Sequence, residues 1–303
     1  MAAAARLLEL RLGRDMTAVV IDGKAVSQKI RAECRGRVKG LQETHGVTPC
    51  LAVILIGDSH ASQVYVRNKM RAAEDVGLLS RPFIFDRDVP VATVLDLIDR
   101  LNQDLDVHGI LVQLPLPPQF NIYTVLHRIS PAKDVDGFHL YNVGGLVVGD
   151  TIFSPCTPFG VMKLLEDQGI EIAGQNVVVV GASNIVGKPM ALMMMQQDAT
   201  VTICHARTRD LAQFTILADI LIVAAGVPGL ILKQMVRRGA VVIDVGINRL
   251  PSGEIVGDVD FEGVSEKASF ITPVPGGVGP MTVSMLIWNT ITSAERHMTM
   301  HPV

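Results

Sequence analysis

The 303-residue sequence lacks the features that mark several classes of protein. Its four cysteines stand far apart without C-x-x-C spacing, which favours reduced thiols of a cytosolic protein over a disulfide framework. The eight histidines form no H-E-x-x-H pair, so the sequence predicts no metal site. The longest apolar candidate, 216–227, is interrupted by Asp219 and is too short to span a membrane. With 27 basic and 30 acidic residues, the chain carries no charge excess that would favour nucleic acid.

The sequence is rich in aliphatic runs that alternate between strand and helix patterns. A content of 49% hydrophobic and 19% charged residues is typical of an α/β enzyme with ample material for a core. In the first half the patterns predict a mostly parallel sheet with helices between its strands. The expected strands are 51–56, 82–85 and 109–113, and the expected helices are 23–45, 59–76, 91–105 and 122–129.

The stretch 176–189 organises the second half. Its four valines, 177–180, predict a strand covered on both faces, and Gly181 allows a sharp turn into a helix. The start of such a helix presents unpaired N–H groups and a positive dipole end, which together favour phosphate. The spacing of Gly181, Ser183 and Gly187 departs from the full G-x-G-x-x-G, so an ordinary buried turn remains an alternative.

A second strand pattern, 200–204, follows at the distance of one crossover helix, as a βαβ unit requires. After it the chain offers Arg207 and Arg209 and no acid for the ribose hydroxyls of NAD. Basic groups at this position suit the 2′-phosphate of NADP. Alternatively, the two arginines are solvated loop charges.

The rest of the chain connects and completes these two parts. The glycine-rich segment 130–157 shows little periodicity and reads as an irregular crossing between domains. Thr157 is the expected N-cap of a helix that ends at Gly169. Further strands are expected at 220–224 and 241–245, an extended loop at 271–280, and a last helix over about 282–296 that returns to the first domain. Residues 1–15 have the composition of either a targeting segment or a nonessential extension, and we favour the extension.

Three groups of polar residues in the first half are candidates for chemistry. Ser62, Tyr65 and Lys69 share one helix face, where the ring can stack and the amine can exchange protons, although a half-exposed face is the alternative. Gln113 ends a strand at the sheet edge where ligands bind in α/β proteins, unless it is merely solvated. Asp136, two residues after another aspartate, is a further candidate, with an ordinary Asx turn as the alternative.

The motifs, taken in order, resemble the bifunctional methylenetetrahydrofolate dehydrogenase and methenyltetrahydrofolate cyclohydrolase proteins, the FolD family. The resemblance runs from about Val20 to Ser293. It is carried by Asp22-Gly-Lys24, Ser62-Gln-Val-Tyr65-Val-Arg-Asn-Lys69, Gln113-Leu-Pro-Leu-Pro117, Lys133-Asp-Val-Asp136-Gly-Phe138, Pro155-Cys-Thr-Pro158, Gly181-Ala-Ser-Asn-Ile-Val-Gly-Lys-Pro189, Asp244-Val-Gly-Ile-Asn248 and Thr272-Pro-Val-Pro-Gly-Gly-Val-Gly-Pro-Met-Thr282.

The resemblance implies two reactions of one-carbon metabolism that serve purine biosynthesis. NADP-dependent oxidation converts 5,10-methylenetetrahydrofolate to 5,10-methenyltetrahydrofolate, and hydrolysis then gives 10-formyltetrahydrofolate. It implies a folate cleft between two α/β domains, in which Tyr65 stacks on the aminobenzoyl ring and Asp136 bonds the pterin. Lys69 would manage protons with Gln113 and Ser62 as helpers. Pro275, Gly276 and Gly277 would line one wall of the site.

The resemblance also assigns the domains and the cofactor residues. It implies a folate-binding catalytic domain over 16–155, completed by a helix over 281–298, and a Rossmann-type NADP-binding domain over 156–275. Two positions, Ala182 and Ala206, depart from the Arg and Ser with which the family commonly holds the 2′-phosphate. The missing acid still favours NADP over NAD. The expected cofactor residues are Gly181, Ala182, Ser183, Ile185, Val186, Ala206, Arg207, Ile247 and Thr282.

The resemblance further implies a homodimer and a cytoplasmic enzyme, with no metal, nucleic-acid or membrane partner. Two other functions are open. A shikimate-dehydrogenase-like NADP oxidoreductase shares the architecture but does not account for Tyr65 four residues before Lys69. A noncatalytic NADP-binding regulator would predict the loss of Lys69 or Asp136, and both are present.

Overall fold

The computed structural model describes residues 18–300, which divide into two compact units. One, the three-stranded unit, comprises 25–160 and 281–300, and the other, the six-stranded unit, comprises 18–24 and 161–280. The expected extension over 1–15 lies outside the described residues. Over 18–300 every helix is too short or too polar to cross a membrane.

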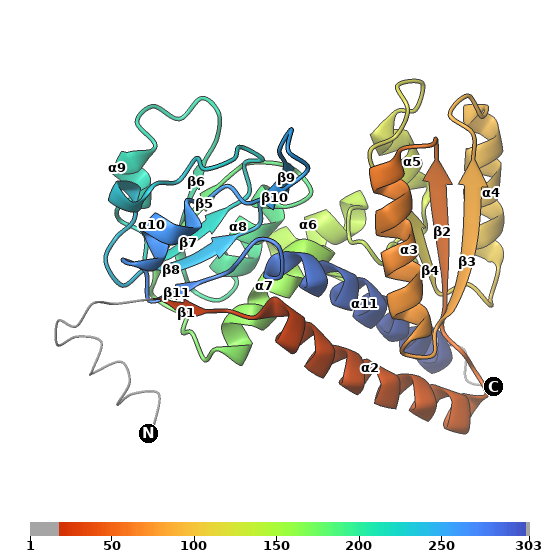
Figure 1. The fold of residues 1–303 in the computed structure, drawn as a ribbon. Helices are drawn as coiled ribbons and strands as arrows, with labels where there is room; N and C mark the ends of the chain where they lie inside the picture. The colour runs from red at the N-terminus through yellow and green to blue at the C-terminus, as the bar shows by residue number, and fades with distance from the viewer. Residues whose placement is uncertain (1–17, 301–303) are drawn as a thin grey trace. The chain divides into compact units, whose positions relative to one another are not determined.

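The sheet of the three-stranded unit has the order β3-β2-β4, and all its strands are parallel. These strands are β2 (Cys50–Ile56), β3 (Leu79–Phe85) and β4 (Gly109–Val112). Every residue of β2 is buried, because the strand is central and the sheet is covered on both faces. Figure 1 shows α3 (His60–Glu74) and α4 (Val91–Gln103) on opposite sides of this sheet. The prediction of a mostly parallel sheet is confirmed.

One layer of this unit follows directly from helical periodicity. In α4 the apolar residues Val94, Leu97, Ile98 and Leu101 recur at the spacing of a single helix face, and all four are buried. They form one core cluster with the alternate residues 50, 52, 54 and 56 of β2, which point to the same side of the sheet. Each such side chain contributes roughly 1.5–3 kcal/mol through burial. The short α5 (Ile122–Arg128) adds Val125 to the same cluster.

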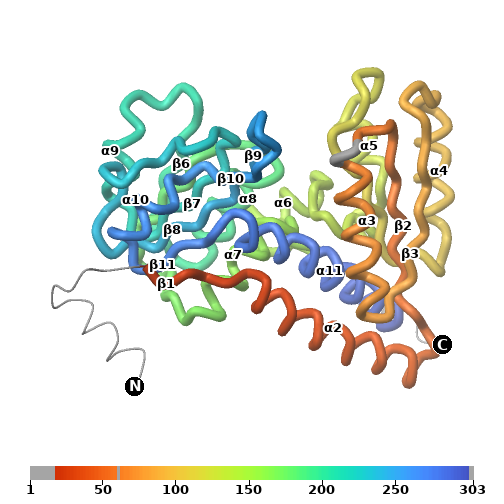
Figure 2. Tube along the Cα trace, viewed as in Figure 1, coloured from red at the N-terminus to blue at the C-terminus, as the bar shows by residue number. Residues whose placement is uncertain are grey.

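Two long helices, α2 (Gly23–His45) and α11 (Val278–Met300), run side by side in the same direction in this unit (Figure 2). The Oγ atoms of Ser27 and Ser284 are 2.8 Å apart near their starts. Farther along, the Arg37 guanidinium donates two hydrogen bonds, of 2.9 and 2.6 Å, to the Glu295 carboxylate. The same guanidinium lies 4.3 Å from the centre of the Trp288 ring. These contacts hold the last helix of the chain against α2 within this unit.

The sheet of the six-stranded unit has the order β1-β11-β8-β7-β5-β6 and is parallel throughout. The chain enters its βαβ part at β5, leaves to β6 on one side and returns to β7 on the other. The carboxyl end of β5 is therefore the switch point at which open α/β sheets bind ligands. The strands are β1 (Val19–Val20), β5 (Asn176–Val180), β6 (Thr200–Cys204), β7 (Ile220–Val223), β8 (Val241–Asp244) and β11 (Phe270–Ile271).

Short elements complete the six-stranded unit. β9 (Asn248–Arg249) and β10 (Ile255–Val256) form an antiparallel pair. The helices are α8 (Gly187–Met195), α9 (Ala212–Thr215) and α10 (Phe261–Ser265), with a 3-10 turn over Lys233–Met235. The helix α7 (Cys156–Asp167) carries the chain from the three-stranded unit into this one.

The prediction that 130–157 is irregular is wrong, because this segment contains α6 (Leu140–Val148). The helix begins where His139 Nδ1 accepts a hydrogen bond from Tyr141 N, and it ends at Gly149, which is left-handed with φ of 81°. Gly145 weakened the helical pattern in the sequence. A Cβ at this position would lie 2.4 Å from Asp150 O, so close packing requires glycine there.

Two helix starts also differ from the prediction. α7 begins at Cys156, so Thr157 is not its N-cap, and the Thr157 hydroxyl lies 3.0 Å from that of Thr282 instead. α11 begins at Val278, within the segment predicted as an extended loop. Pro280 lies in its first turn, where a residue without an N–H group loses no helical hydrogen bond.

Candidate active site

Lys69 and Gln113, predicted from separate motifs, meet in the three-stranded unit. Lys69 on α3 donates a hydrogen bond from Nζ to Gln113 Oε1 at 3.2 Å. Gln113 directly follows β4, and its amide is held in turn, because Nε2 donates to Leu114 O at 2.7 Å. The backbone N–H of Gln113 donates to Ile54 O at 2.9 Å. The sheet edge thus fixes an amide oxygen against a half-buried amine.

Tyr65 lies one helical turn before Lys69 on α3 and is 43% exposed, so its ring is available for stacking. Ser62 lies one turn further back and is buried. Its backbone N–H donates to the Oγ of Ser59, the N-cap of α3. The proton-handling role expected of Ser62 stays a prediction.

Asp136 stands on a tight turn that packs against the Pro155 segment. Gly137 follows it with φ of 78°, and a Cβ there would lie 2.7 Å from Pro155 N, so glycine is needed for both conformation and space. Asp136 is half-buried. Burial raises the pKa of its carboxyl, while the positive charge of Lys69 and a hydrogen bond from the Cys156 thiol act in the opposite direction. Lys69 and Asp136 are therefore within electrostatic reach of each other.

Three residues behind this turn are not among the site residues expected from the sequence. Asp134 is buried and accepts hydrogen bonds from His139 N at 2.7 Å and Asn142 Nδ2 at 2.8 Å. Burial raises the pKa of Asp134 to about 7, more than these hydrogen bonds lower it. Burial, followed by the nearby Asp136, also raises the pKa of the Cys156 thiol well above its ordinary value. The third residue, Asn289, donates to Val135 O at 2.9 Å.

The predicted phosphate turn joins β5 to α8 in the six-stranded unit. Gly181 has φ of 124°, and a Cβ there would lie 2.2 Å from Ala224 O. A Cβ at Gly187 would lie 1.9 Å from Gly181 O. The backbone therefore folds so closely on itself that neither position accepts a side chain, as a dinucleotide turn requires. The Ser183 Oγ accepts from Val186 N at 3.1 Å, which fixes the turn that also carries Ala182 and Ile185.

The segment after β6 forms an exposed turn beside this strand. His205 N donates to Thr208 Oγ1 at 2.9 Å, and Arg207 N donates to His205 Nδ1 at 3.1 Å. Ala206 and the two arginines, 207 and 209, are exposed, and 205–209 contains no acid. The donor set of this turn therefore fits a dinucleotide with a 2′-phosphate.

Two buried carboxylates organise the loops that follow β7 and β8. The Asp258 carboxylate accepts hydrogen bonds from 225 N, 226 N and 227 N at 2.7–2.9 Å and from Asn248 Nδ2 at 2.8 Å. Asp244 accepts from 246 N, 258 N and 259 N at 2.9–3.0 Å. Burial raises the pKa of Asp244 to about 6 despite these bonds. The loops place Ile247, half exposed, near the carboxyl edge of the sheet. The role of Asp258 was not apparent from the sequence.

The predicted loop residues Pro275, Gly276 and Gly277 precede α11 in the six-stranded unit. Gly276 has φ of 112°, and Gly277 N donates to Pro273 O at 2.9 Å, which closes a tight turn. Thr282 belongs to the three-stranded unit instead, so the structure does not group it with the other expected cofactor residues. Its cofactor role stays a prediction.

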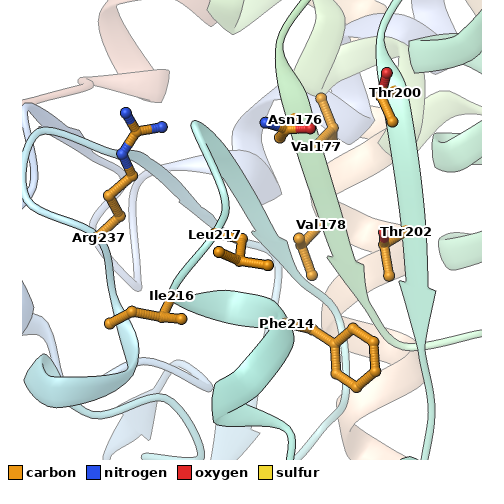
Figure 3. A pocket seen from close by; sticks show the side chains of 9 residues that line it. All are labelled: Asn176, Val177, Val178, Thr200, Thr202, Phe214, Ile216, Leu217 and Arg237. Carbon is orange, nitrogen blue, oxygen red and sulfur yellow. The ribbon is translucent and has the colours of Figure 1, made fainter.

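An open hollow of about 360 Å³ lies elsewhere on the six-stranded unit (Figure 3). It begins at Asn176 and Thr200, the first residues of β5 and β6, and is bounded by Phe214, Leu217 and Arg237. Because the strands are parallel, these starts lie at the opposite edge of the sheet from Gly181. The hollow is therefore not part of the candidate site. Among residues 18–300, no three His, Cys, Asp or Glu side chains are grouped so as to hold a metal ion.

Comparison with known proteins matches both parts of the chain. The family model for the catalytic domain of tetrahydrofolate dehydrogenase/cyclohydrolase matches 21–136, and that for its NAD(P)-binding domain matches 155–298. The bifunctional protein FolD of Nitrosospira multiformis is 58% identical over 281 residues, covering 93% of this chain and 97% of that protein.

Two solved structures are similar over almost their whole length. The crystal structure of the bifunctional enzyme FolD from Campylobacter jejuni has a TM-score of 0.91 at 51% identity, covering 92% of this chain and 99% of that one. The Trypanosoma brucei methylenetetrahydrofolate dehydrogenase-cyclohydrolase, complexed with NADP and an inhibitor, has a TM-score of 0.89 at 41% identity, covering 92% and 98%.

Proposed function

The chain belongs to the tetrahydrofolate dehydrogenase/cyclohydrolase family, and from this premise we propose that it catalyses both reactions of that family. It oxidises 5,10-methylenetetrahydrofolate with NADP to the methenyl form, and it hydrolyses that product to 10-formyltetrahydrofolate. The observation that carries the proposal is the hydrogen bond from Lys69 to Gln113, formed within electrostatic reach of Asp136.

The two side chains proposed to bind the folate, Tyr65 and Asp136, lie in the three-stranded unit. The exposed Tyr65 ring stacks on the aminobenzoyl group, and the half-buried Asp136 carboxyl hydrogen-bonds the pterin. Tyr65 stands on α3 and Asp136 on the Gly137 turn, and both segments pack against the rest of the unit. Because the two side chains are held in place, they can orient the folate before reaction. Pro275, Gly276 and Gly277 supply backbone that a ligand can approach closely.

Hydrolysis needs a group that exchanges protons with the attacking water, and Lys69 has that role. Water attacks the cationic methenyl carbon, and Lys69 Nζ accepts a proton from it when the amine is neutral. The bond from this carbon to N5 of the folate then breaks, N5 takes up a proton, and the carbon remains on N10 as the formyl group. Gln113 Oε1, fixed by the Nε2 bond to Leu114 O, holds Nζ in one place. The bond thereby supplies orientation, which is a large part of the advantage an enzyme has over solution.

The cofactor role falls to the turn between β5 and α8 and to the segment after β6. Bound there, NADP would supply the acceptor for the hydride that leaves the methylene bridge. The turn with Gly181, Ala182, Ser183, Ile185 and Val186 would hold the pyrophosphate, and Ile247 would contact the nicotinamide. Arg207 beside Ala206 attracts the 2′-phosphate, in place of the acid that NAD would favour.

The two other functions are not favoured. Models of both domains of one folate family match the chain, which a shikimate-dehydrogenase-like enzyme does not explain. A noncatalytic regulator does not explain why Lys69 and Gln113 are hydrogen-bonded. We further propose a cytoplasmic homodimer. Free, buried thiols at all four cysteines support the location, and the family resemblance supports the dimer.

Hydrolysis of methenyltetrahydrofolate by the purified protein without NADP tests the second activity in isolation. The expected result is a loss of the methenyl absorbance faster than in buffer alone. A rate equal to that in buffer would leave only the dehydrogenase and contradict the bifunctional assignment.

A further inference from the structure

Asn289 is a buried amide on α11 whose hydrogen bonds converge behind the candidate site. It is 3% exposed. Its Nδ2 donates to Val135 O at 2.9 Å and to Ser154 O at 3.1 Å, so both protons of the amide group are used. The same nitrogen lies 3.7 Å from Cys156 Sγ.

The two acceptor carbonyls lie on the segments that present Asp136. Val135 is its immediate neighbour, and Ser154 precedes Pro155, on which the Gly137 turn packs. A further hydrogen bond joins the segments directly, because Cys156 N donates to Asp136 O at 3.4 Å. One amide from α11 therefore connects the Asp136 turn to the segment against which it rests.

We propose that Asn289 is a positioning residue for folate binding. It holds the Asp136 carboxyl in the position and orientation that a hydrogen bond to the pterin requires. The inference rests on the proposed function, since it assumes that Asp136 binds the substrate. Asn289 itself is buried behind the turn and acts only through the Val135 and Ser154 carbonyls that it bonds. Loss of its amide removes one donor from the half-buried Ser154 carbonyl and one from the Val135 carbonyl, which keeps the thiol of Cys156 at 3.3 Å. Without the amide the two segments lose the side chain that joins them, and the turn can shift.

Other buried polar residues of α11 do not connect these two segments. Ser284 bonds Ser27 on α2, and the Thr290 hydroxyl bonds Leu286 O within its own helix at 2.8 Å. Ser284 is thus a matched control, being a buried hydrogen-bonding residue of the same helix that faces α2 instead of the Asp136 turn.

The test compares Asn289→Ala and Asn289→Ser with Ser284→Ala in the full-length protein. KM for methylenetetrahydrofolate, KM for NADP and kcat are measured in the dehydrogenase assay, and the dissociation constant for tetrahydrofolate is measured by calorimetry. We expect Asn289→Ala to raise KM and the dissociation constant for folate about five- to tenfold, with KM for NADP within about twofold of the wild type. Asn289→Ser, which restores one donor, should show a smaller effect, and Ser284→Ala none on folate binding.

A uniform fall in kcat with unchanged folate KM would mean only a smaller folded fraction and would overturn the inference. Equal effects of Asn289→Ala and Ser284→Ala on folate binding would overturn it as well. If Asn289→Ala does not fold, Asn289→Ser decides the question by the same measurements. Failure of the proposed function would appear separately, as a wild type that neither reduces NADP nor binds tetrahydrofolate.

Discussion

At the residue scale, the hydrolytic half of the proposed function depends on the Lys69 amine. Lys69→Met keeps the length and most of the volume of the side chain but removes the group that exchanges protons and bonds Gln113. We expect the hydrolysis of methenyltetrahydrofolate to fall by at least about a hundredfold, as is typical for the loss of an acid or base. The dissociation constant for tetrahydrofolate, measured by calorimetry, should change little.

Lys39→Met is the matched control for this substitution, because Lys39 is exposed on α2 and pairs with Glu43 one turn away. It should hydrolyse the methenyl substrate at the wild-type rate. Hydrolysis that survives in Lys69→Met would show that another group handles the proton.

Asp134 gives a prediction about pH. Its pKa of about 7 in the folded protein lies above the ordinary 3.8, so between these values the folded state binds a proton that the unfolded chain has lost. Its contribution to stability is therefore present below about pH 4 and is lost as pH rises through 7. Asp134→Asn has no such titration. Between pH 4.5 and 8 we expect the free energy of unfolding of the variant to rise relative to that of the wild type, by up to roughly 3 kcal/mol.

Urea titrations at the two pH values measure this change. Asp244 titrates in both proteins, so its contribution cancels from the comparison. The control is Asp88→Asn at an exposed position. For this variant, the difference from the wild type in the free energy of unfolding should be the same at both pH values. If the free energies of unfolding of Asp134→Asn and the wild type differ equally at both pH values, burial does not hold the Asp134 carboxyl of the wild type protonated.

Sequence reasoning found the residues that stand on recognisable motifs. Lys69, Gln113 and Asp136 come from three such motifs, and the structure brings them within reach of one another. Asn289 could not be found in this way, because it is 154 residues from the Val135 carbonyl that it bonds. No local sequence pattern indicates which distant carbonyl a buried amide in an apolar helix will bond.

At the scale of secondary-structure elements, the start of α8 is the most tightly constrained feature of the candidate cofactor site. Gly187→Ala would place a Cβ 1.9 Å from Gly181 O, so the helix must move away from the turn. We expect a loss of roughly 1–3 kcal/mol in the free energy of unfolding and a rise in the dissociation constant for NADP. Urea titration and calorimetry measure the two effects.

Gly36→Ala provides the contrast, because Gly36 lies within α2 with nothing within 4 Å of the added Cβ. There the alanine should stabilise the protein by about 0.5–1 kcal/mol and leave NADP binding unchanged. Gly187→Ala that binds NADP like the wild type would show that the close turn is not needed for the cofactor.

Elements with a strong local signal were predicted well. The central strands β2 and β5 are buried aliphatic runs, and the helix α4 has one clean apolar face. α6 was missed because two adjacent glycines interrupt its pattern, and Gly145 is required by the approach of Asp150 O rather than by the helix itself. Tertiary packing overrides local propensity at such positions.

At the scale of the whole molecule, each unit is assembled from segments that are distant in the chain. β1 pairs with β11, so Val19 lies opposite Phe270, and the two strands extend a sheet whose other members lie between them in sequence. α11 likewise packs on α2 through Ser27 and Ser284, 257 residues apart. The α/β class follows from local alternation of patterns, whereas these long-range pairings do not.

The central claim is that one chain oxidises methylenetetrahydrofolate with NADP and hydrolyses the product. The most direct test incubates the purified protein with methylenetetrahydrofolate and NADP, then with NAD, while the absorbances of reduced nicotinamide and of the methenyl product are followed together. The account predicts reduction that is faster with NADP, without lasting accumulation of the methenyl product. Equal or faster reduction with NAD, accumulation of the methenyl product, or no reduction with either cofactor would contradict it.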